Sequence, residues 1–179
     1  MSGKPRIGIS ACLLGEPVRW DAGHKRDAYL VDVLGRRVEW VPVCPEVEAG
    51  FPTPREPMHL VRTTAHGIRL MTAQTEHDVT GRMARYVNAR VAELAKANLS
   101  GYLLKTDSPS CGMEGVKVHT AEGAVERKGR GLFAEALMAR LPALPIEEDG
   151  RLSDPRLRKN FIERVFAYHR MRASLDSSV

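Results

Sequence analysis

The stretch Arg6–Cys12 reads RIGISAC, a short apolar run that ends in a cysteine. Val38–Cys44 repeats this arrangement as VEWVPVC, and the apolar run Gly101–Leu104 leads through a proline-containing turn to Cys111. Short apolar runs bounded by turn residues predict buried strands of a parallel sheet. Because the carboxyl ends of parallel strands open onto one crevice, we expect the three cysteines to meet there.

The segments between these strands predict helices and one hairpin. Thr80–Asn98 is the clearest helix, because apolar residues recur at helical spacing along it. Pro155–Arg172 is a second, with Asp154 as its N-cap and Pro155 in its first turn. The other expected elements are a helix at His24–Leu34 ended by Gly35, an ordered proline-rich loop at Cys44–Pro57, a hairpin of Met58–Val61 with Gly67–Met71, and a helix at Gly131–Arg140. Strands that alternate with helices predict an α/β fold, here a three-layer α/β/α, Rossmann-like domain with a mostly parallel sheet.

Length and composition predict a single domain that spans residues 1–179. The chain has 43% hydrophobic residues, enough to bury a core of its own. Three cysteines are an odd count, and no run approaches the roughly 20 apolar residues of a membrane span. We therefore expect a cytoplasmic protein with reduced thiols and no membrane association. A net charge of +5, with 27 basic and 22 acidic residues, favours small anionic ligands over long nucleic acids and leaves the oligomeric state open.

Three convergent thiols favour a metal centre over three unrelated structural cysteines. A [4Fe-4S] cluster normally takes four thiolates, so three would leave one iron open to water, a carboxylate or a substrate sulfur. Zinc would need a histidine as well, and its ligands usually come in closely spaced pairs, unlike these cysteines. A catalytic thiol would need a low pKa, and buried structural thiols are the remaining alternative. The histidines available for zinc are His24, His59, His66, His77, His119 and His169.

Four motifs resemble the TudS desulfidase family. They are GISACLLG at Gly8–Gly15, VCPE at Val43–Glu46, KTDSPSCG at Lys105–Gly112 and GRGLFA at Gly129–Ala134. The motifs occur in the family's order and cover the chain from about residue 6 to at least residue 140, without a large insertion.

The resemblance implies a cofactor, a reaction and the residues that serve them. It implies a [4Fe-4S] cluster bound by Cys12, Cys44 and Cys111, and two catalytic residues, Glu46 and Ser108. The implied reaction removes sulfur from thiolated pyrimidines such as 2-thiouracil, 4-thiouracil and 4-thiouridine monophosphate, giving the oxo form and sulfide without redox change.

The chemistry of these residues is consistent with that implication. An open iron would make the thiocarbonyl carbon more electrophilic and accept the departing sulfide. Glu46, close to Cys44 in sequence, could deprotonate the attacking water or exchange a proton with the ring, and Ser108 could orient the substrate or relay a proton. Structural alternatives stay open, because Glu46 could instead cap a turn or pair with Arg55, and a serine before proline commonly forms turns. Ser10 and Ser110 are undecided between hydrogen bonds to the cluster and to the backbone.

A basic turn before a predicted helix is the candidate phosphate contact. Lys128, Arg130 and Gly131 open the helix that ends at Arg140, and a helix N-terminus favours anions. We predict that they bind substrate phosphate, with an ordinary helix-start turn as the alternative.

The sequence leaves two alternative functions open. The first is removal of 4-thiouridine sulfur from tRNA, because the last predicted helix is basic. Its basic residues are Arg156, Arg158, Lys159, Arg164, Arg170 and Arg172. They alternate with apolar residues as in an amphipathic helix docked on a core, so we do not expect nucleic acid as the partner. The second is a zinc-dependent pyrimidine hydrolase, which metal content would distinguish.

Overall fold

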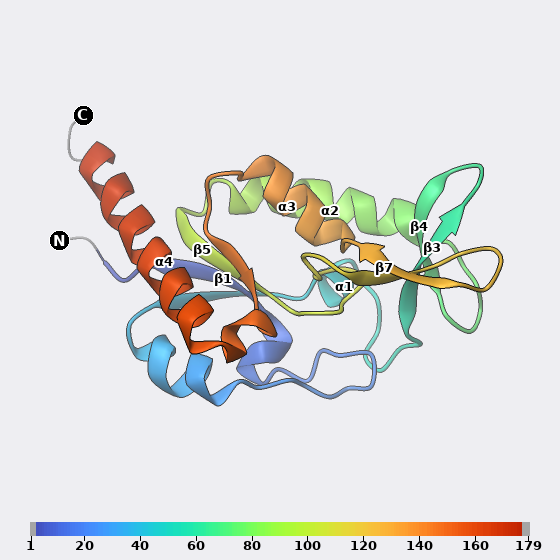
Figure 1. The fold of residues 1–179 in the computed structure, drawn as a ribbon, viewed down its shortest axis with the longest axis horizontal. Coiled ribbons are helices and arrows are strands. Elements are labelled where there is room, and N and C mark those ends of the chain that lie inside the picture. Colours follow the sequence, from blue (N-terminus) through green and yellow to red (C-terminus); the bar gives the residue numbers. More distant parts are fainter. Residues whose placement is uncertain (1–2, 177–179) are drawn as a thin grey trace.

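A four-stranded sheet forms the centre of the protein in a computed structural model that describes residues 3–176 (Figure 1). Its strand order is β2-β1-β5-β8, and every neighbouring pair is parallel. The strands are β1 (Arg6–Ser10), β2 (Glu39–Val43), β5 (Leu99–Leu104) and β8 (Ile146–Glu148). The first three are the strands predicted from the runs that lead to the cysteines, so the parallel sheet is confirmed. Pro42 is tolerated in β2 because this strand lies at the sheet edge.

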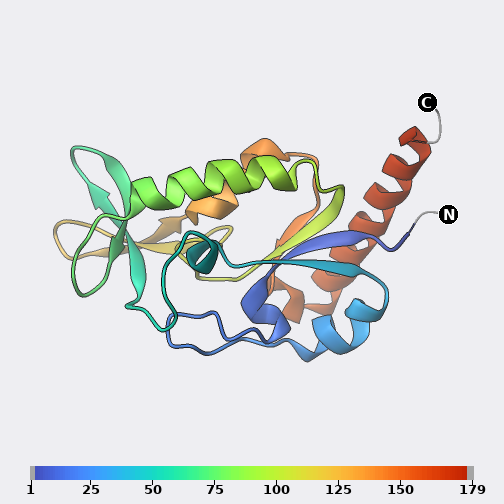
Figure 2. The same cartoon turned by 180° about the vertical axis from the view of Figure 1, so that it is seen from behind.

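Helices cover both faces of this sheet, which confirms the three-layer α/β/α arrangement (Figures 1 and 2). They are α2 (Thr80–Leu94), α3 (Leu132–Arg140), α4 (Pro155–Asp176), η2 (Tyr29–Val33) and η3 (Leu34–Arg36). Tyr102 and Leu104 of β5 point to the face that α2 and α3 cover. Leu103, between them, packs with Phe161 and Val165 of α4 on the opposite face. This alternation along β5 is expected of a strand buried on both sides.

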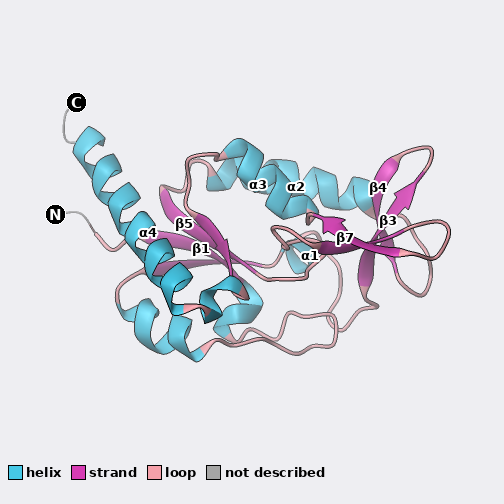
Figure 3. Cartoon of the chain, viewed as in Figure 1, coloured by secondary structure: helices cyan, strands magenta, loops and turns pink. Residues whose placement is uncertain are grey.

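A second four-stranded sheet lies beside the first, at the far end of α2 (Figure 3). Its order is β4-β3-β6-β7, with a parallel central pair and an antiparallel hairpin on each side. The strands are β3 (Met58–Thr63), β4 (Gly67–Thr72), β6 (Val116–His119) and β7 (Val125–Gly129). The predicted hairpin is β3–β4 and is confirmed. We did not predict the β6–β7 hairpin or the second sheet that it completes.

The helix predicted at His24–Leu34 is wrong in its start and in its regularity. Residues 24–27 are not helical, because the backbone N–H groups of Lys25 and Asp27 donate to the carbonyls of Cys12 and Leu13. The carboxylate of Asp27 then accepts the backbone N–H of Leu30, at 3.0 Å, at the true helix start. The helix is a π turn followed by a 3-10 turn, and Gly35 lies inside the latter instead of ending it.

The prediction of a continuous loop from Cys44 to Pro57 is also wrong, because α1 (Pro45–Glu48) begins directly after the cysteine. Pro45 occupies the first helical position, where a missing N–H costs nothing. The long α2 ends at Leu94, four residues before the expected end.

The last helix, α4, confirms the expected cap. The Asp154 carboxylate accepts the backbone N–H of Arg156 at 2.8 Å, and Pro155 begins the helix. Its apolar side, with Phe161 and Val165, is buried against the sheet, as an amphipathic helix requires. Among the helices of residues 3–176, none combines the length and the apolar character needed to cross a membrane.

Candidate active site

A cavity of about 400 Å³ opens at the carboxyl ends of β1, β2 and β5. Cys12, Cys44 and Cys111 all line it, together with Glu46 and Ser108. The structure thus brings the five residues implied as ligands and catalytic groups to the walls of one cavity.

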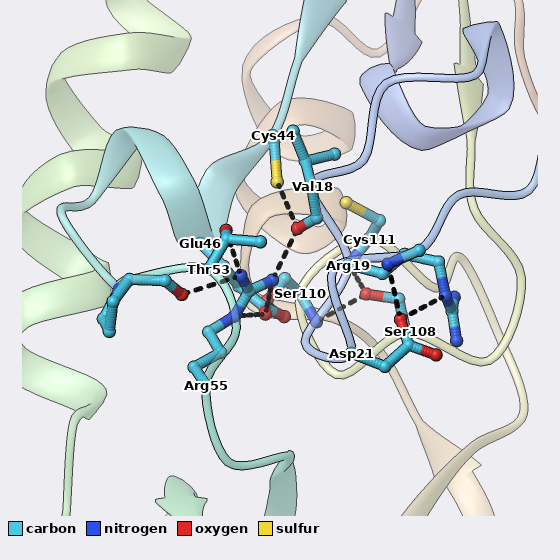
Figure 4. Close-up of polar contacts among 12 residues, drawn as sticks. Val18, Arg19, Asp21, Cys44, Glu46, Thr53, Arg55, Ser108, Ser110 and Cys111 are labelled. Atoms are coloured by element: carbon cyan, nitrogen blue, oxygen red, sulfur yellow. Dashed lines mark hydrogen bonds and ion pairs between the residues drawn. The ribbon is translucent and has the colours of Figure 1, made fainter.

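Each cysteine is positioned by a different local structure. Cys12 lies in the 3-10 turn η1 (Ala11–Leu14), which ends at Gly15 with a φ of 96°. Cys44 immediately precedes α1, and its Sγ donates to the carbonyl of Val18 at 3.8 Å (Figure 4). Cys111 belongs to the longer loop after β5, and its backbone N–H donates to Ser108 Oγ at 3.0 Å. All three are free cysteines.

Burial controls the protonation of these thiols. It raises the pKa of Cys12 from 9.0 to about 11, although the nearby Lys105 cation opposes the shift. Burial also raises the pKa of Cys44 and, most strongly, of Cys111. At Cys111 a hydrogen bond with Ser10 lowers the pKa, and the neighbouring thiols of Cys44 and Cys12 raise it further. Without a metal the three thiols are therefore protonated at neutral pH. This disfavours the alternative of a free thiolate nucleophile, which needs a lowered pKa.

The Glu46 side chain is held on both of its oxygens (Figure 4). Oε2 pairs with the Arg55 guanidinium, at 2.7 Å from Nη2 and 2.8 Å from Nε. Oε1 accepts a hydrogen bond from Ser110 Oγ at 2.9 Å. The pairing with Arg55, considered as a structural alternative to catalysis, is therefore present, and it occurs within the cavity.

Ser108 and Ser110 have different surroundings in the same turn. Ser108 Oγ accepts the backbone N–H groups of Ser110, at 3.2 Å, and of Cys111, at 3.0 Å. Ser108 therefore shapes the turn, as its structural alternative predicts, while its hydroxyl proton remains available at the cavity wall. Ser110, which sequence reasoning left undecided, is the serine that reaches Glu46. Its one sequence signal is its place directly before Cys111 in a Pro-Ser turn.

The basic turn before α3 does not join the cysteine cavity. Lys128 and Arg130 line a separate cavity of about 440 Å³, together with acidic Glu114 and Glu135. Arg130 Nε donates to the carbonyl of Met113 at 2.8 Å. The cations that line the cysteine cavity are Arg19, Lys25, Arg55 and Lys105, none of which was predicted to bind phosphate.

Gly131, the third residue of the predicted phosphate contact, lies next to the loop that carries Cys111. It is the N-cap of α3, and its backbone packs directly against that of Ser110 and Cys111.

Comparison with known proteins places this site in a family. The family model described as 2-thiouracil desulfurase matches residues 7–149. The chain belongs to this 2-thiouracil desulfurase family. The matched region contains all three cysteines, Glu46 and Ser108. The family resemblance stated from the sequence motifs is therefore confirmed.

Two individual proteins are similar to this 2-thiouracil desulfurase family member. The solved structure of the [4Fe-4S]-dependent thiouracil desulfidase TudS matches 88% of this chain and 99% of its own, with 31% identity and a TM-score of 0.66. The uncharacterized protein YbbK of Bacillus subtilis strain 168 is 32% identical over 111 residues, which is 59% of this chain and 72% of YbbK. The structural likeness supports the assignment of the α/β fold.

The residues of this 2-thiouracil desulfurase family member suit a cluster better than a single metal ion. Among residues 3–176, no three His, Cys, Asp or Glu side chains lie close enough together to chelate one ion. Cysteines that bind a [4Fe-4S] cluster each hold a separate iron, so their sulfurs stand farther apart than the ligands of one ion. All six histidines lie within the described residues and none lines the cysteine cavity, so the expected zinc site of three cysteines and one histidine is not assembled there.

Proposed function

We propose that the protein converts thiolated pyrimidines to their oxo forms and sulfide, using a [4Fe-4S] cluster held by Cys12, Cys44 and Cys111. The candidate substrates are 2-thiouracil, 4-thiouracil and 4-thiouridine monophosphate. The observation that carries the proposal is that the three thiols share one cavity with the Glu46 carboxylate. The family match and the likeness to TudS support the same class of reaction. We place this activity in the reducing cytosol, because all three cysteines are free.

The proposed mechanism assigns separate tasks to the side chains. When bound, the cluster supplies one iron without a cysteine ligand, a Lewis acid for the thiocarbonyl sulfur of the substrate. Glu46 takes a proton from the water that adds to the ring carbon. Ser108 donates its hydroxyl proton to the substrate in a hydrogen bond, since its oxygen already accepts two backbone N–H groups. One water enters and one sulfide leaves, so no electron donor is required.

Two cations compensate the negative charge that this chemistry gathers. Lys105 Nζ is fixed by Asp149 at 3.0 Å, and its charge acts on Cys12. Arg19 also acts on Cys12 and lines the same cavity. Both positive charges stabilise thiolates and a departing sulfide anion.

Two sets of residues could contact the phosphate of a nucleotide substrate. Lys128, Arg130 and Gly131 are the set proposed from the sequence, whereas Arg19 and Lys25 line the cysteine cavity itself. Replacing Arg130 by Ala tests the first set. An equal change in the specificity constants for thio-base and thio-nucleotide would refute the first set. Arg19 and Lys25 would then be the remaining candidates for the phosphate contact.

The first experiment is anaerobic purification and reconstitution, followed by measurement of iron, zinc and acid-labile sulfide per chain. We expect about four irons and four sulfides. The loaded protein should then release sulfide from at least one of the three candidate substrates, with loss of the thiocarbonyl absorbance. One zinc without labile sulfide would replace the proposal by a zinc hydrolase, and a loaded cluster that releases no sulfide would refute it.

A further inference from the structure

Glu46 is fixed by two side chains that come from different parts of the chain. Arg55 lies in the loop after α1, and Ser110 lies in the loop after β5. Their three contacts with the carboxylate are 2.7 to 2.9 Å long. The site is also enclosed, because the side chain of Arg55 is only 6% exposed, that of Glu46 14%, and Ser110 1%. Contacts this short between groups this buried restrict a carboxylate to one orientation.

Arg55 is itself immobilised, so it can hold Glu46 in place. Its Nη2 also donates to the carbonyl of Val18 at 2.9 Å, and its Nη1 donates to Pro52 and Thr53. Its backbone N–H donates to the carbonyl of Trp20 at 2.8 Å. All three guanidinium nitrogens thus have partners, and a planar guanidinium with these contacts cannot rotate without breaking several of them.

The same arginine connects the carboxylate with the surroundings of Cys44. The carbonyl of Val18 accepts a hydrogen bond from Arg55 and, in the protein without a cluster, where Cys44 is protonated, a second one from Cys44 Sγ. Val18 and Trp20 belong to the loop after η1, and both line the cysteine cavity. Arg55 therefore links three parts of the cavity wall: the loop after η1, the start of α1 and its own loop.

We propose that Arg55 and Ser110 are positioning residues, which fix the orientation of the Glu46 carboxylate for its work on the attacking water. This inference rests on the proposed function, and it goes further by naming residues that act through Glu46 and not on the substrate. Arg55 supplies two coplanar donors to one oxygen, a geometry that lysine cannot reproduce. Ser110 supplies the donor on the other oxygen. A reacting group displaced by about 1 Å can lose about 100-fold in rate, so loosening either contact should slow the chemical step.

The test uses the cluster-loaded protein and two conservative variants, Arg55→Lys and Ser110→Ala. We expect kcat to fall by about 10- to 100-fold in each, with KM within about twofold of the wild type. Iron and sulfide per chain and the cluster absorption spectrum should stay unchanged. The matched controls are Arg69→Lys, whose arginine pairs with Asp78 at 2.7 Å on the second sheet, and Ser100→Ala, which removes a buried hydroxyl bonded to His169. Both controls lie outside the cavity and should keep wild-type kcat.

A double-mutant cycle separates positioning from a merely structural role. In a Glu46→Ala background, Arg55→Lys and Ser110→Ala should cause no further fall in kcat, because the carboxylate that Arg55 and Ser110 position is gone. A further fall as large as in the wild-type background would overturn the inference. So would full activity of both single variants, or a loss of iron that matches the loss of activity. A loaded wild-type protein without desulfidase activity would instead refute the proposed function itself.

Discussion

Replacing Gly131 by Ala should disturb the cysteine loop from outside the cavity. The φ of Gly131 is −64°, which any residue adopts, so the position needs glycine for space and not for backbone freedom. A Cβ added there would lie 2.7 Å from the backbone nitrogen of Cys111 and closer still to the carbonyl group of Ser110. Ordinary contact begins at 3.4 Å.

The size of the effect follows from what must move. The Ser110–Cys111 backbone has to retreat by about 1 Å, and overpacking of this kind costs about 1–3 kcal/mol. The Ser110 carbonyl also accepts the N–H groups of Phe133, at 3.0 Å, and Ala134, at 3.2 Å, at the start of α3. Weakening these two hydrogen bonds adds about 1 kcal/mol. We expect the free energy of unfolding to fall by about 3 kcal/mol in total.

Two measurements check this expectation. Urea denaturation of the metal-free protein gives the free energy of unfolding, and iron analysis after reconstitution reports whether the proposed cluster site, with Cys111 as a ligand, still forms. Gly81→Ala is the matched control, because Gly81 lies in the first turn of α2 and its added Cβ would meet nothing closer than Arg85 Nη1, at 3.7 Å. It should gain up to about 1 kcal/mol, since alanine favours a helix. A Gly131→Ala protein with wild-type stability and iron content would refute the reasoning.

Two further predictions concern stability. Although burial opposes it, hydrogen bonds from Arg69 and Thr80 lower the pKa of Asp78 from 3.8 to about 2. The ionised carboxylate therefore stabilises the fold above about pH 4, and this contribution is lost as the pH falls toward 2. Asp78→Asn should lower the free energy of unfolding by about 1 kcal/mol at pH 7. Urea titrations at several pH values should show the difference between wild type and variant shrink toward pH 2. A difference that does not depend on pH would contradict this. The Tyr102 hydroxyl is buried with no hydrogen-bond partner among residues 3–176, so Tyr102→Phe should raise the stability of the metal-free protein by about 1 kcal/mol. Tyr86→Phe loses a 2.6 Å hydrogen bond to Glu48 of α1 and should lower the stability of the metal-free protein by a similar amount. Equal effects of the two tyrosine changes would refute the argument.

Three strands of the parallel sheet, β1, β2 and β5, could be predicted because each belongs to a short, mostly apolar run bounded by turn residues, whereas β8 was not predicted. The second sheet could not, because its strands carry little apolar signal. In β6 only Val116 and Val118 are buried, and β7 has no buried residue. β8 departs furthest from the usual pattern, since Glu147 and Glu148 are both buried in it. Glu147 is accommodated by Arg151, at 2.7 Å, and Glu148 accepts the backbone N–H of Met113 at 2.9 Å. Only the folded structure supplies such partners.

The same distinction applies to the cavity. The gathering of the cysteines follows from topology, because the carboxyl ends of adjacent parallel strands share one edge. The contacts of Glu46 do not, since Ser110 reaches it across 64 residues and Arg55 across nine. Such contacts depend on the course of loops that no periodicity describes. The family motifs singled out Glu46 and Ser108 as candidates, and the sequence also suggested the pairing of Glu46 with Arg55, whereas the contact of Glu46 with Ser110 required coordinates.

Cys111 shows why the second sheet matters for the site. Cys12 and Cys44 follow their strands almost directly, but Cys111 lies well beyond the end of β5 and needs other anchors. The backbone N–H of Gly131 donates to the carbonyl of Gly112 at 2.8 Å, next to the cysteine. Gly131 follows β7, and β7 pairs with β6 in the hairpin that continues the cysteine loop. The loop is therefore closed on itself by the β6–β7 hairpin and the start of α3. A hairpin with almost no hydrophobic signal thus determines where the third thiol lies.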